Sequence, residues 1–155
     1  MELINRTALV TGGGSGIGAA AAVKLAAAGA DIALLGRTRS ELDEIAEKVR
    51  AAGRTALVLT ADISEEAEMS AAFDAAGKAF GRLDFVFANA GINGVWAPLQ
   101  ELGYGDWNKT MAINLGGTFL TLRLAVPLML ERGGSIAITS SINGTRTFTS
   151  AGASA

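Results

Sequence analysis

The sequence predicts an α/β fold, in which helices cover both faces of a parallel β-sheet. Short apolar blocks rich in β-branched residues alternate with longer blocks whose apolar residues recur at helical spacing. Each pair of blocks occupies roughly 30 residues, the usual size of a β-α-β unit. Most of the short blocks are continuously apolar, as expected for strands buried on both faces of a parallel sheet.

Each short apolar block is predicted to be a strand, and the longer blocks are the helices between them. Because right-handed crossovers join such strands, the order 3-2-1-4-5 is expected if a ligand binds where the winding reverses. The predicted strands are residues 7–10, 31–35, 56–60, 83–88 and 135–139.

The first three predicted helices each end at a glycine, which readily takes the left-handed conformation that closes a helix. The first helix begins near Ser15, and the third begins after Ser64. The second opens with Ser40 and Asp43 in the spacing of a capping box. The expected ends are Gly29, Gly53 and Gly81.

The fourth predicted helix, about residues 106–132, is apolar on nearly every side. Such a helix is expected to be covered on every side. It contains Pro127, which removes one backbone donor and is expected to bend the helix.

Composition excludes several classes of function. The 155 residues include 13 Lys and Arg, 15 Asp and Glu, and no Cys or His. Disulfides, thiol nucleophiles, an imidazole base and the commonest metal ligands are therefore absent, and no metal site is expected. The net charge of −2, with scattered basic residues, gives no surface for nucleic acid.

A membrane span is not expected from the longest apolar stretch, because Lys24, Gly29 and Asp31 interrupt it. The apolar run before Thr11 is too short for a signal peptide. A soluble cytoplasmic protein is the interpretation that these features favour.

A run of glycines follows the first strand and opens the first helix: Thr11-Gly12-Gly13-Gly14-Ser15-Gly16-Ile17-Gly18. Side chains there would keep backbone N–H groups and the helix N-terminus away from a phosphate. Because of its place between strand and helix, the run predicts a dinucleotide-binding turn, with a flexible loop as the alternative. The expected contacts are Gly12, Gly14, Ser15, Gly16, Ile17 and Gly18.

The spacing of Thr11, Gly12, Gly16 and Gly18 resembles the T-G-x-x-x-G-x-G turn of the classical short-chain dehydrogenases/reductases. The resemblance extends from Thr7 onward and implies a Rossmann-type doubly wound sheet that binds NAD(P), with Asp62 and Ile63 at the adenine. Further matches occur in the family's order: Asp62-Ile63 after the third strand, Asn89-Ala90-Gly91 after the fourth, Asn114 in the fourth helix, and Ser140-Ser141 after the fifth strand.

The end of the second strand bears on the choice of cofactor. It reads Gly36-Arg37-Thr38-Arg39, so no carboxylate stands there to repel the 2′-phosphate of NADP. Arg37 offers a planar guanidinium that suits a phosphate, so NADP is favoured, with NAD as the alternative. Ser15 stands against NADP, because many NADP-preferring members of the family carry a basic residue there. Arg37 and Arg39 could also be solvated residues ahead of a helix.

The resemblance also implies an oxidoreductase that transfers a hydride between nicotinamide and a small carbonyl or alcohol substrate. In the family, a tyrosine acts as acid and base, a lysine lowers its pKa, a serine binds the substrate oxygen and an asparagine holds a relay water. Ser141 matches the serine and Asn114 the asparagine. Each also has a structural interpretation, a turn at a strand end for Ser141 and a polar break in a helix for Asn114.

The family's Tyr-x-x-x-Lys motif is not found in residues 1–155. The sole tyrosine, Tyr104, has Asn108 four residues later and does not match. We therefore expect residues 1–155 to be the NAD(P)-binding Rossmann domain of a longer enzyme, truncated before that motif and inactive alone. The parent would be a homodimer or homotetramer, as is common in the family, and the fifth strand and fourth helix would show uncovered apolar surface.

A non-catalytic dinucleotide-binding sensor or scaffold protein is the alternative function. Loss of the tyrosine and lysine would suit it, whereas retention of Ser141 and Asn114 argues against it, because a sensor needs neither. The loop at residues 91–98 is expected to line the substrate side of the nicotinamide pocket. Its Trp96 either stacks on a substrate or anchors the loop against the core.

Overall fold

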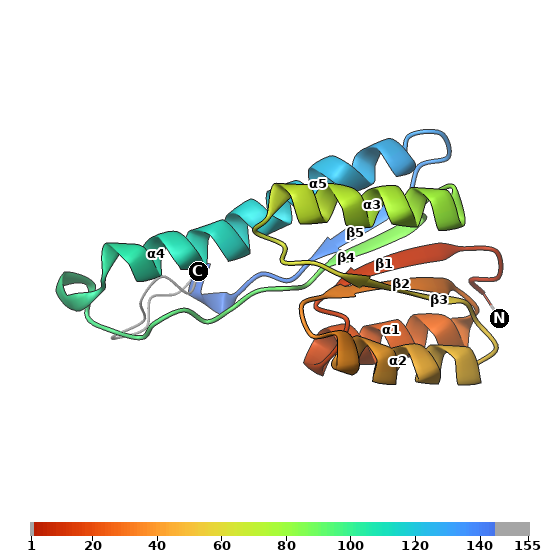
Figure 1. Ribbon diagram of the computed structural model, residues 1–155, viewed down its shortest axis with the longest axis horizontal. Helices are drawn as coiled ribbons and strands as arrows, with labels where there is room; N and C mark the ends of the chain where they lie inside the picture. Colours follow the sequence, from red (N-terminus) through yellow and green to blue (C-terminus); the bar gives the residue numbers. More distant parts are fainter. Residues whose placement is uncertain (1, 145–155) are drawn as a thin grey trace.

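Parallel strands form the centre of the molecule, and their order in the sheet is β3-β2-β1-β4-β5 (Figure 1). The computed structural model describes residues 2–144. This order is the one that the sequence predicts, and the sheet is of the Rossmann type. The strands are β1 Thr7–Thr11, β2 Asp31–Gly36, β3 Ala56–Thr60, β4 Phe85–Ala88 and β5 Ser135–Ile138.

Helices cover both faces of the sheet. The pair α1 (Gly16–Ala28) and α2 (Arg39–Ala51) lies on one face, and α3 (Glu66–Phe80) and α5 (Gly117–Ala125) lie on the other (Figure 1). Successive residues of β1 point to opposite faces, so β1 contributes to both apolar clusters. Val10 packs with the cluster beneath α1 and α2, and Leu9 packs with the one beneath α3 and α5.

The ends of the first three helices agree only in part with the sequence prediction. Glycines with positive φ follow α1, α2 and α3 as predicted. The capping box of Ser40 and Asp43 is not formed, because α2 begins earlier, at Arg39, and Thr38 is its N-cap. Asp43 instead pairs with Arg39, with 3.0 Å between Nε and Oδ1.

The fourth helical segment is built from several turns that differ in hydrogen bonding. It comprises α4 (Tyr104–Met111), a π-helical turn (Ala112–Gly116), α5, and a 3-10 turn (Val126–Leu128). Pro127 lies in the last turn and ends the helix, whereas a bend was expected, because proline has no N–H to continue the ladder. Two further 3-10 turns are Leu99–Glu101 and Ile142–Gly144.

Within the described residues this helix is not covered on every side, and it shows the uncovered apolar surface that is expected of residues 1–155. Leu115 and Phe119 are 62% and 59% exposed. Only one side of the segment packs on α3 and the sheet. Residues Tyr104–Leu128 are long and apolar enough to cross a membrane by length and composition. That criterion is weak evidence by itself, and the α5 part of the segment packs on α3 and β4.

At the amino end of the sheet, the buried carboxylate of Asp84 ties β1 to the turn before β4. It accepts hydrogen bonds from Arg6 Nη1 at 2.7 Å and from the Thr7 backbone N–H at 2.9 Å. Arg82 Nε lies 3.2 Å from the same carboxylate. Burial raises the pKa of Asp84, but these hydrogen bonds and charges outweigh it, so the pKa lies below its ordinary value.

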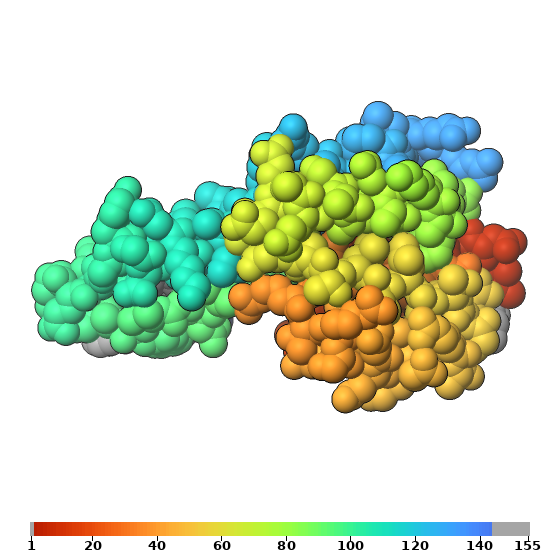
Figure 2. Space-filling view, in the orientation of Figure 1, coloured from red at the N-terminus to blue at the C-terminus, as the bar shows by residue number. Residues whose placement is uncertain are grey.

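At the opposite end of the sheet, α4 and the segment before it project from the body as a lobe (Figure 2). The carboxyl ends of the strands lead toward the base of this lobe (Figure 1). In doubly wound sheets, ligands bind at the carboxyl ends of strands, where the strand order reverses. The fold therefore places the predicted site residues at this edge.

Candidate functional site

The glycine turn between β1 and α1 depends on two kinds of constraint. Gly12 and Gly16 have φ of 66° and 52°, a region that side chains disfavour. A Cβ atom at Gly18 would collide with the Gly12 carbonyl oxygen. These glycines therefore allow the chain to turn sharply from the strand into the helix, whose N-terminus faces the carboxyl end of the sheet.

Hydrogen bonds join this turn to the ends of β4 and β5. The Thr11 hydroxyl oxygen accepts from the backbone N–H groups of Asn89 and Ala90, at 2.9 and 3.1 Å. The Asn89 side chain donates from Nδ2 to the Thr11 carbonyl at 3.2 Å. It accepts at Oδ1 from the Thr139 hydroxyl at 3.0 Å. The three strand ends are thereby held in one arrangement.

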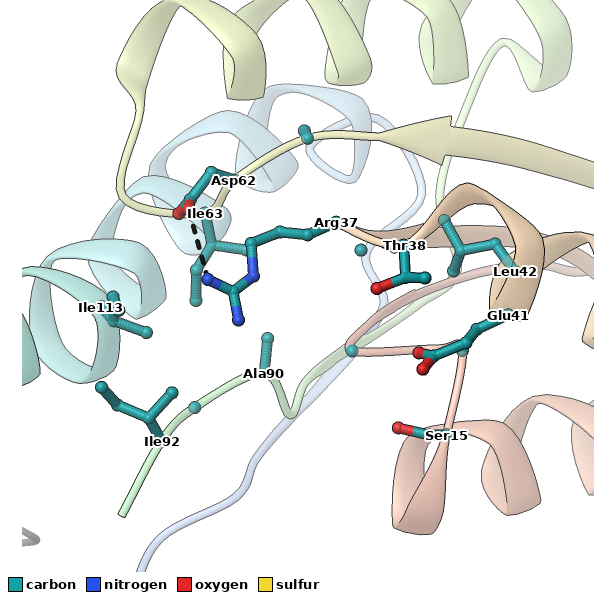
Figure 3. A pocket seen from close by; sticks show the side chains of 15 residues that line it. Ser15, Arg37, Thr38, Glu41, Leu42, Asp62, Ile63, Ala90, Ile92 and Ile113 are labelled. Carbon is teal, nitrogen blue, oxygen red and sulfur yellow. Dashed lines mark ion pairs between the residues drawn. The ribbon is translucent and has the colours of Figure 1, made fainter. Parts of the chain in front are cut away.

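A cavity of about 200 Å³ opens beside the glycine turn (Figure 3). Arg37 and Asp62 lie on one side of it, with 3.7 Å between Arg37 Nη1 and Asp62 Oδ2. Arg39 lies outside this lining, on the surface of α2. Both arginine side chains are largely exposed, at 63% and 65%, and Arg37 alone lines the cavity. The predicted residues that line the cavity are Gly12, Gly14, Ser15, Arg37, Asp62, Ile63, Ala90 and Gly91.

Asp62 is charged and held in place at the rim of this cavity. Its Oδ1 accepts from the Ser64 backbone N–H at 2.9 Å and from the Ser64 hydroxyl at 2.7 Å. Burial raises the pKa of Asp62, but these hydrogen bonds and the charges of Arg37 and Lys109 outweigh it and hold the pKa below its ordinary value. A fixed anion therefore lies beside Arg37 at the rim of the cavity.

A second carboxylate in this cavity was missed from the sequence. Glu41, in the first turn of α2, lines the cavity and lies between Thr38 and Ser15 in the view of Figure 3. A Cβ atom placed on Gly14 would be 3.3 Å from Glu41 Oε2, so this side chain borders the glycine turn. No carboxylate follows β2 directly, but α2 brings the carboxylate of Glu41 to the cavity.

A second cavity, of about 500 Å³, adjoins the first. The two share Ala90, Gly91 and Ile92 as a common wall. The remaining predicted residues line the second cavity, apart from Gly16 and Gly18. These two glycines instead allow the conformation of the glycine turn. These lining residues are Ile17, Asn89, Asn114 and Ser141.

Asn114 lies in the π-helical turn between α4 and α5. Its Oδ1 accepts from the Ile92 N–H and its Nδ2 donates to the Ile92 carbonyl, both at 2.9 Å. The amide oxygen and nitrogen are thus engaged with the segment after β4. The Asn114 backbone carbonyl accepts from the Thr118 hydroxyl at 2.7 Å and has a second lone pair.

Ser141 follows β5 and shares the second cavity with Asn114. Its hydroxyl oxygen accepts from the Asn143 N–H at 3.2 Å, and its side chain is exposed. Trp96 is 57% exposed, so it does not anchor its loop in the core of the described chain. The segment 150–155, predicted to lead toward the family's tyrosine, lies outside the described residues.

Comparison with known proteins identifies a family that matches this sequence. The family model for short chain dehydrogenases matches residues 6–154. The chain belongs to the short-chain dehydrogenase family. This membership confirms the resemblance inferred from the glycine turn and the motifs that follow it.

Relatives of this short-chain dehydrogenase family member act on different molecules. It is 40% identical to levodione reductase from Leifsonia aquatica, over 92% of this chain and 54% of that protein. A crystal structure of a 3-ketoacyl-ACP reductase from Sinorhizobium meliloti 1021 is 54% identical, with a TM-score of 0.91, covering 95% of this chain and 58% of that one.

A structure of NAD⁺-bound xylitol dehydrogenase is 33% identical, with a TM-score of 0.92. The alignment covers 99% of this chain and 62% of the xylitol dehydrogenase chain. This short-chain dehydrogenase family member therefore spans about half to three fifths of the length of these relatives.

Proposed function

We propose that residues 1–155 are the cofactor-binding part of an NAD(P)-dependent oxidoreductase, which transfers a hydride between nicotinamide and a carbonyl or alcohol substrate. The observation that carries this proposal is the pair of adjoining cavities with Ala90–Ile92 as their common wall. One is built on the glycine turn and Arg37, and the other holds Asn114 and Ser141. A dinucleotide has two ends and requires two connected compartments of this kind.

The chain's own residues fit such a cofactor. The glycine turn lacks the Cβ atoms that would fill the space beside it, and it would hold the pyrophosphate. Asp62 and Ile63 would contact the adenine. When bound, the nicotinamide donates or accepts the hydride. Ser141 would hydrogen-bond the substrate oxygen, and Asn114 would hold a relay water.

NADP is the cofactor form that we favour. Arg37 lines the cavity, and its guanidinium offers a planar set of donors to a phosphate. Its present partner, Asp62, is 3.7 Å away, so a phosphate with better geometry competes readily for it. NAD is the alternative, and the similar xylitol dehydrogenase has NAD⁺ bound in its structure.

Further chain is proposed to complete the enzyme and to supply the tyrosine and lysine. All four residues of β5 are exposed, including Ile136 and Ile138, although a strand of a doubly wound sheet is normally covered. The relatives are also substantially longer. An assembled homodimer or homotetramer in the cytoplasm is the proposed form of the parent enzyme.

Calorimetric titration of the purified chain with NADP⁺ and NAD⁺ tests the cofactor site. Both are expected to bind, NADP⁺ more tightly. Replacement of Arg37 by Gln is expected to weaken NADP⁺ binding by about tenfold and to change NAD⁺ binding much less. Arg39→Gln is the matched control, because Arg39 pairs with Asp43 outside the cavity. Failure of both dinucleotides to bind the folded chain would contradict the proposal.

The catalytic part of the proposal is tested separately. Residues 1–155 should bind cofactor but show no cofactor-dependent reduction of carbonyl compounds, because they contain no Tyr-x-x-x-Lys motif. A longer form that includes such a motif should reduce them, and Ser141→Ala in that form should lower kcat by at least about a hundredfold. Turnover by residues 1–155 well above the rate without protein would overturn the assignment.

A further inference from the structure

Glu41 and Arg37 bring opposite charges to one cavity. Both side chains line it, Glu41 from the first turn of α2 and Arg37 from the end of β2 (Figure 3). Arg37 pairs with Asp62 at 3.7 Å. Within residues 2–144, the Glu41 carboxylate takes part in no hydrogen bond or ion pair. It is the carboxylate of this cavity that is free to meet a ligand.

Glu41 is placed to contact the same part of a ligand as Arg37. It borders Gly14 in the phosphate-binding turn, and Thr38 separates it from Arg37 along the cavity wall. Ser15, on the other side, is neutral and does not offset its charge. Glu41 lies in the first turn of α2, at the amino end of the helix.

We propose that Glu41 is a specificity-determining residue of the adenosine end of the cofactor site. Its carboxylate opposes a 2′-phosphate and accepts a hydrogen bond from a 2′-hydroxyl. Arg37 favours the phosphate, so the two side chains together allow both NADP and NAD to bind, with a smaller preference for NADP than Arg37 alone would give. This inference rests on the proposed function, because it assigns a role within that cofactor site.

The chemistry of the two ligands explains why one residue affects them in opposite directions. A 2′-phosphate carries more than one negative charge at neutral pH and offers only acceptors once it is fully ionised. A carboxylate has no donor for it and repels it. A ribose hydroxyl is a donor, and a carboxylate is a strong acceptor for it. Removing the charge of Glu41 should therefore separate the two affinities.

Two probes isolate the 2′ position: 5′-AMP, which has a 2′-hydroxyl, and adenosine 2′,5′-bisphosphate, which has a 2′-phosphate. Both are titrated calorimetrically into the wild-type chain, Glu41→Gln, Glu41→Asp and Glu44→Gln. Glu44 is the matched control, since it lies on α2, is exposed, and is outside the cavity lining. Circular dichroism establishes that each variant is folded.

Glu41→Gln is expected to raise the preference for the bisphosphate over 5′-AMP by about three- to tenfold. Glu41→Asp should keep the wild-type preference, and Glu44→Gln should change it less than about twofold. The effect of Glu41→Gln should shrink between about 0.05 M and about 0.5 M salt, because screening weakens an electrostatic contribution. A purely structural role would not produce that salt dependence.

Two other outcomes would overturn the inference and are distinguishable. If both probes bind but Glu41→Gln leaves their ratio as it is in Glu44→Gln, Glu41 does not determine specificity, and the proposed function stands. If neither probe binds the folded wild-type chain, the cofactor site itself is wrong, and the role of Glu41 falls with it.

Discussion

The side-chain amide of Asn114 is hydrogen-bonded at both its oxygen and its nitrogen to the backbone of Ile92. A residue in the middle of a helical segment thus pairs with the chain beyond β4 much as a neighbouring strand would. Ile92 lies in the wall that the two cavities share. The helix therefore fixes the path of the backbone between the proposed cofactor and substrate compartments.

Removal of this pairing should destabilise the fold. Asn114→Ala leaves the N–H and carbonyl of Ile92 without their partners, which is expected to cost about 1–3 kcal/mol of unfolding free energy. Urea unfolding followed by circular dichroism measures it. Asn108→Ala is the control, because Asn108 is exposed on α4. Equal unfolding midpoints for the two variants would contradict the structural role of Asn114.

A substitution in the glycine turn should weaken the binding of NADP⁺. In Gly18→Ala, the new methyl group would meet the Gly12 carbonyl, so the backbone of the turn must move. We expect NADP⁺ affinity to fall by at least about tenfold. Gly105→Ala is the comparison, since Gly105 lies in α4 with open space around it, and alanine should stabilise that helix by up to about 1 kcal/mol. Unchanged NADP⁺ affinity in Gly18→Ala would argue against the turn as the phosphate site.

Asp84 should contribute stability that depends on pH. Its pKa is lowered in the folded chain, so its contribution is complete above the unfolded-state pKa of about 3.9 and is lost as pH falls through the folded-state pKa. Asp84→Asn should lower the unfolding free energy at neutral pH by about 1–3 kcal/mol and flatten its decline in acid. Urea unfolding from about pH 7 to about pH 3 measures both effects.

The control for this prediction is Asp74→Asn, which removes an exposed carboxylate on α3. The unfolding free energies of wild-type and Asp84→Asn chains could instead fall in parallel on acidification. In that case the hydrogen bonds from Arg6 and Thr7 to Asp84 would not be the cause of the pH dependence.

The uncovered strand β5 should make residues 1–155 self-associate. Ile136 and Ile138 are 39% and 50% exposed, and an open apolar edge is a template for pairing with another chain. Light scattering after size exclusion should show mass that rises with protein concentration. Ile136→Lys should reduce the rise, because a charge on an edge strand opposes pairing. A stable monomer at every concentration would contradict this expectation.

The sequence predicts the layout of the sheet well because the signals are local. Each strand is an apolar run bounded by turn residues, and the glycines at 29 and 81 do close their helices. The cavity beside the glycine turn is also lined by residues expected from motifs, including Arg37 and Asp62. Motifs succeed there because each follows directly from the end of a strand.

The sequence does not predict contacts that depend on how separate elements meet. Glu41 enters the cavity because α2 packs beside the glycine turn, and no spacing along the chain reveals this neighbour of Gly14. The cluster around Asp84 likewise joins side chains distant in sequence. The uncovered apolar surface expected on the fourth helix is present, but composition leaves open which segment would cover it.

The π-helical turn at Ala112–Gly116 has a consequence for the register of the whole helical segment. Such a turn takes up one more residue than an α-helical turn. Deleting one residue within it would remove the wide turn and let regular α-helical winding run from α4 into α5. The Asn114 side chain lies in this turn, so it would then lose the position from which it pairs with the backbone of Ile92. One additional residue in a helix thus helps to set the path of the chain between the two cavities.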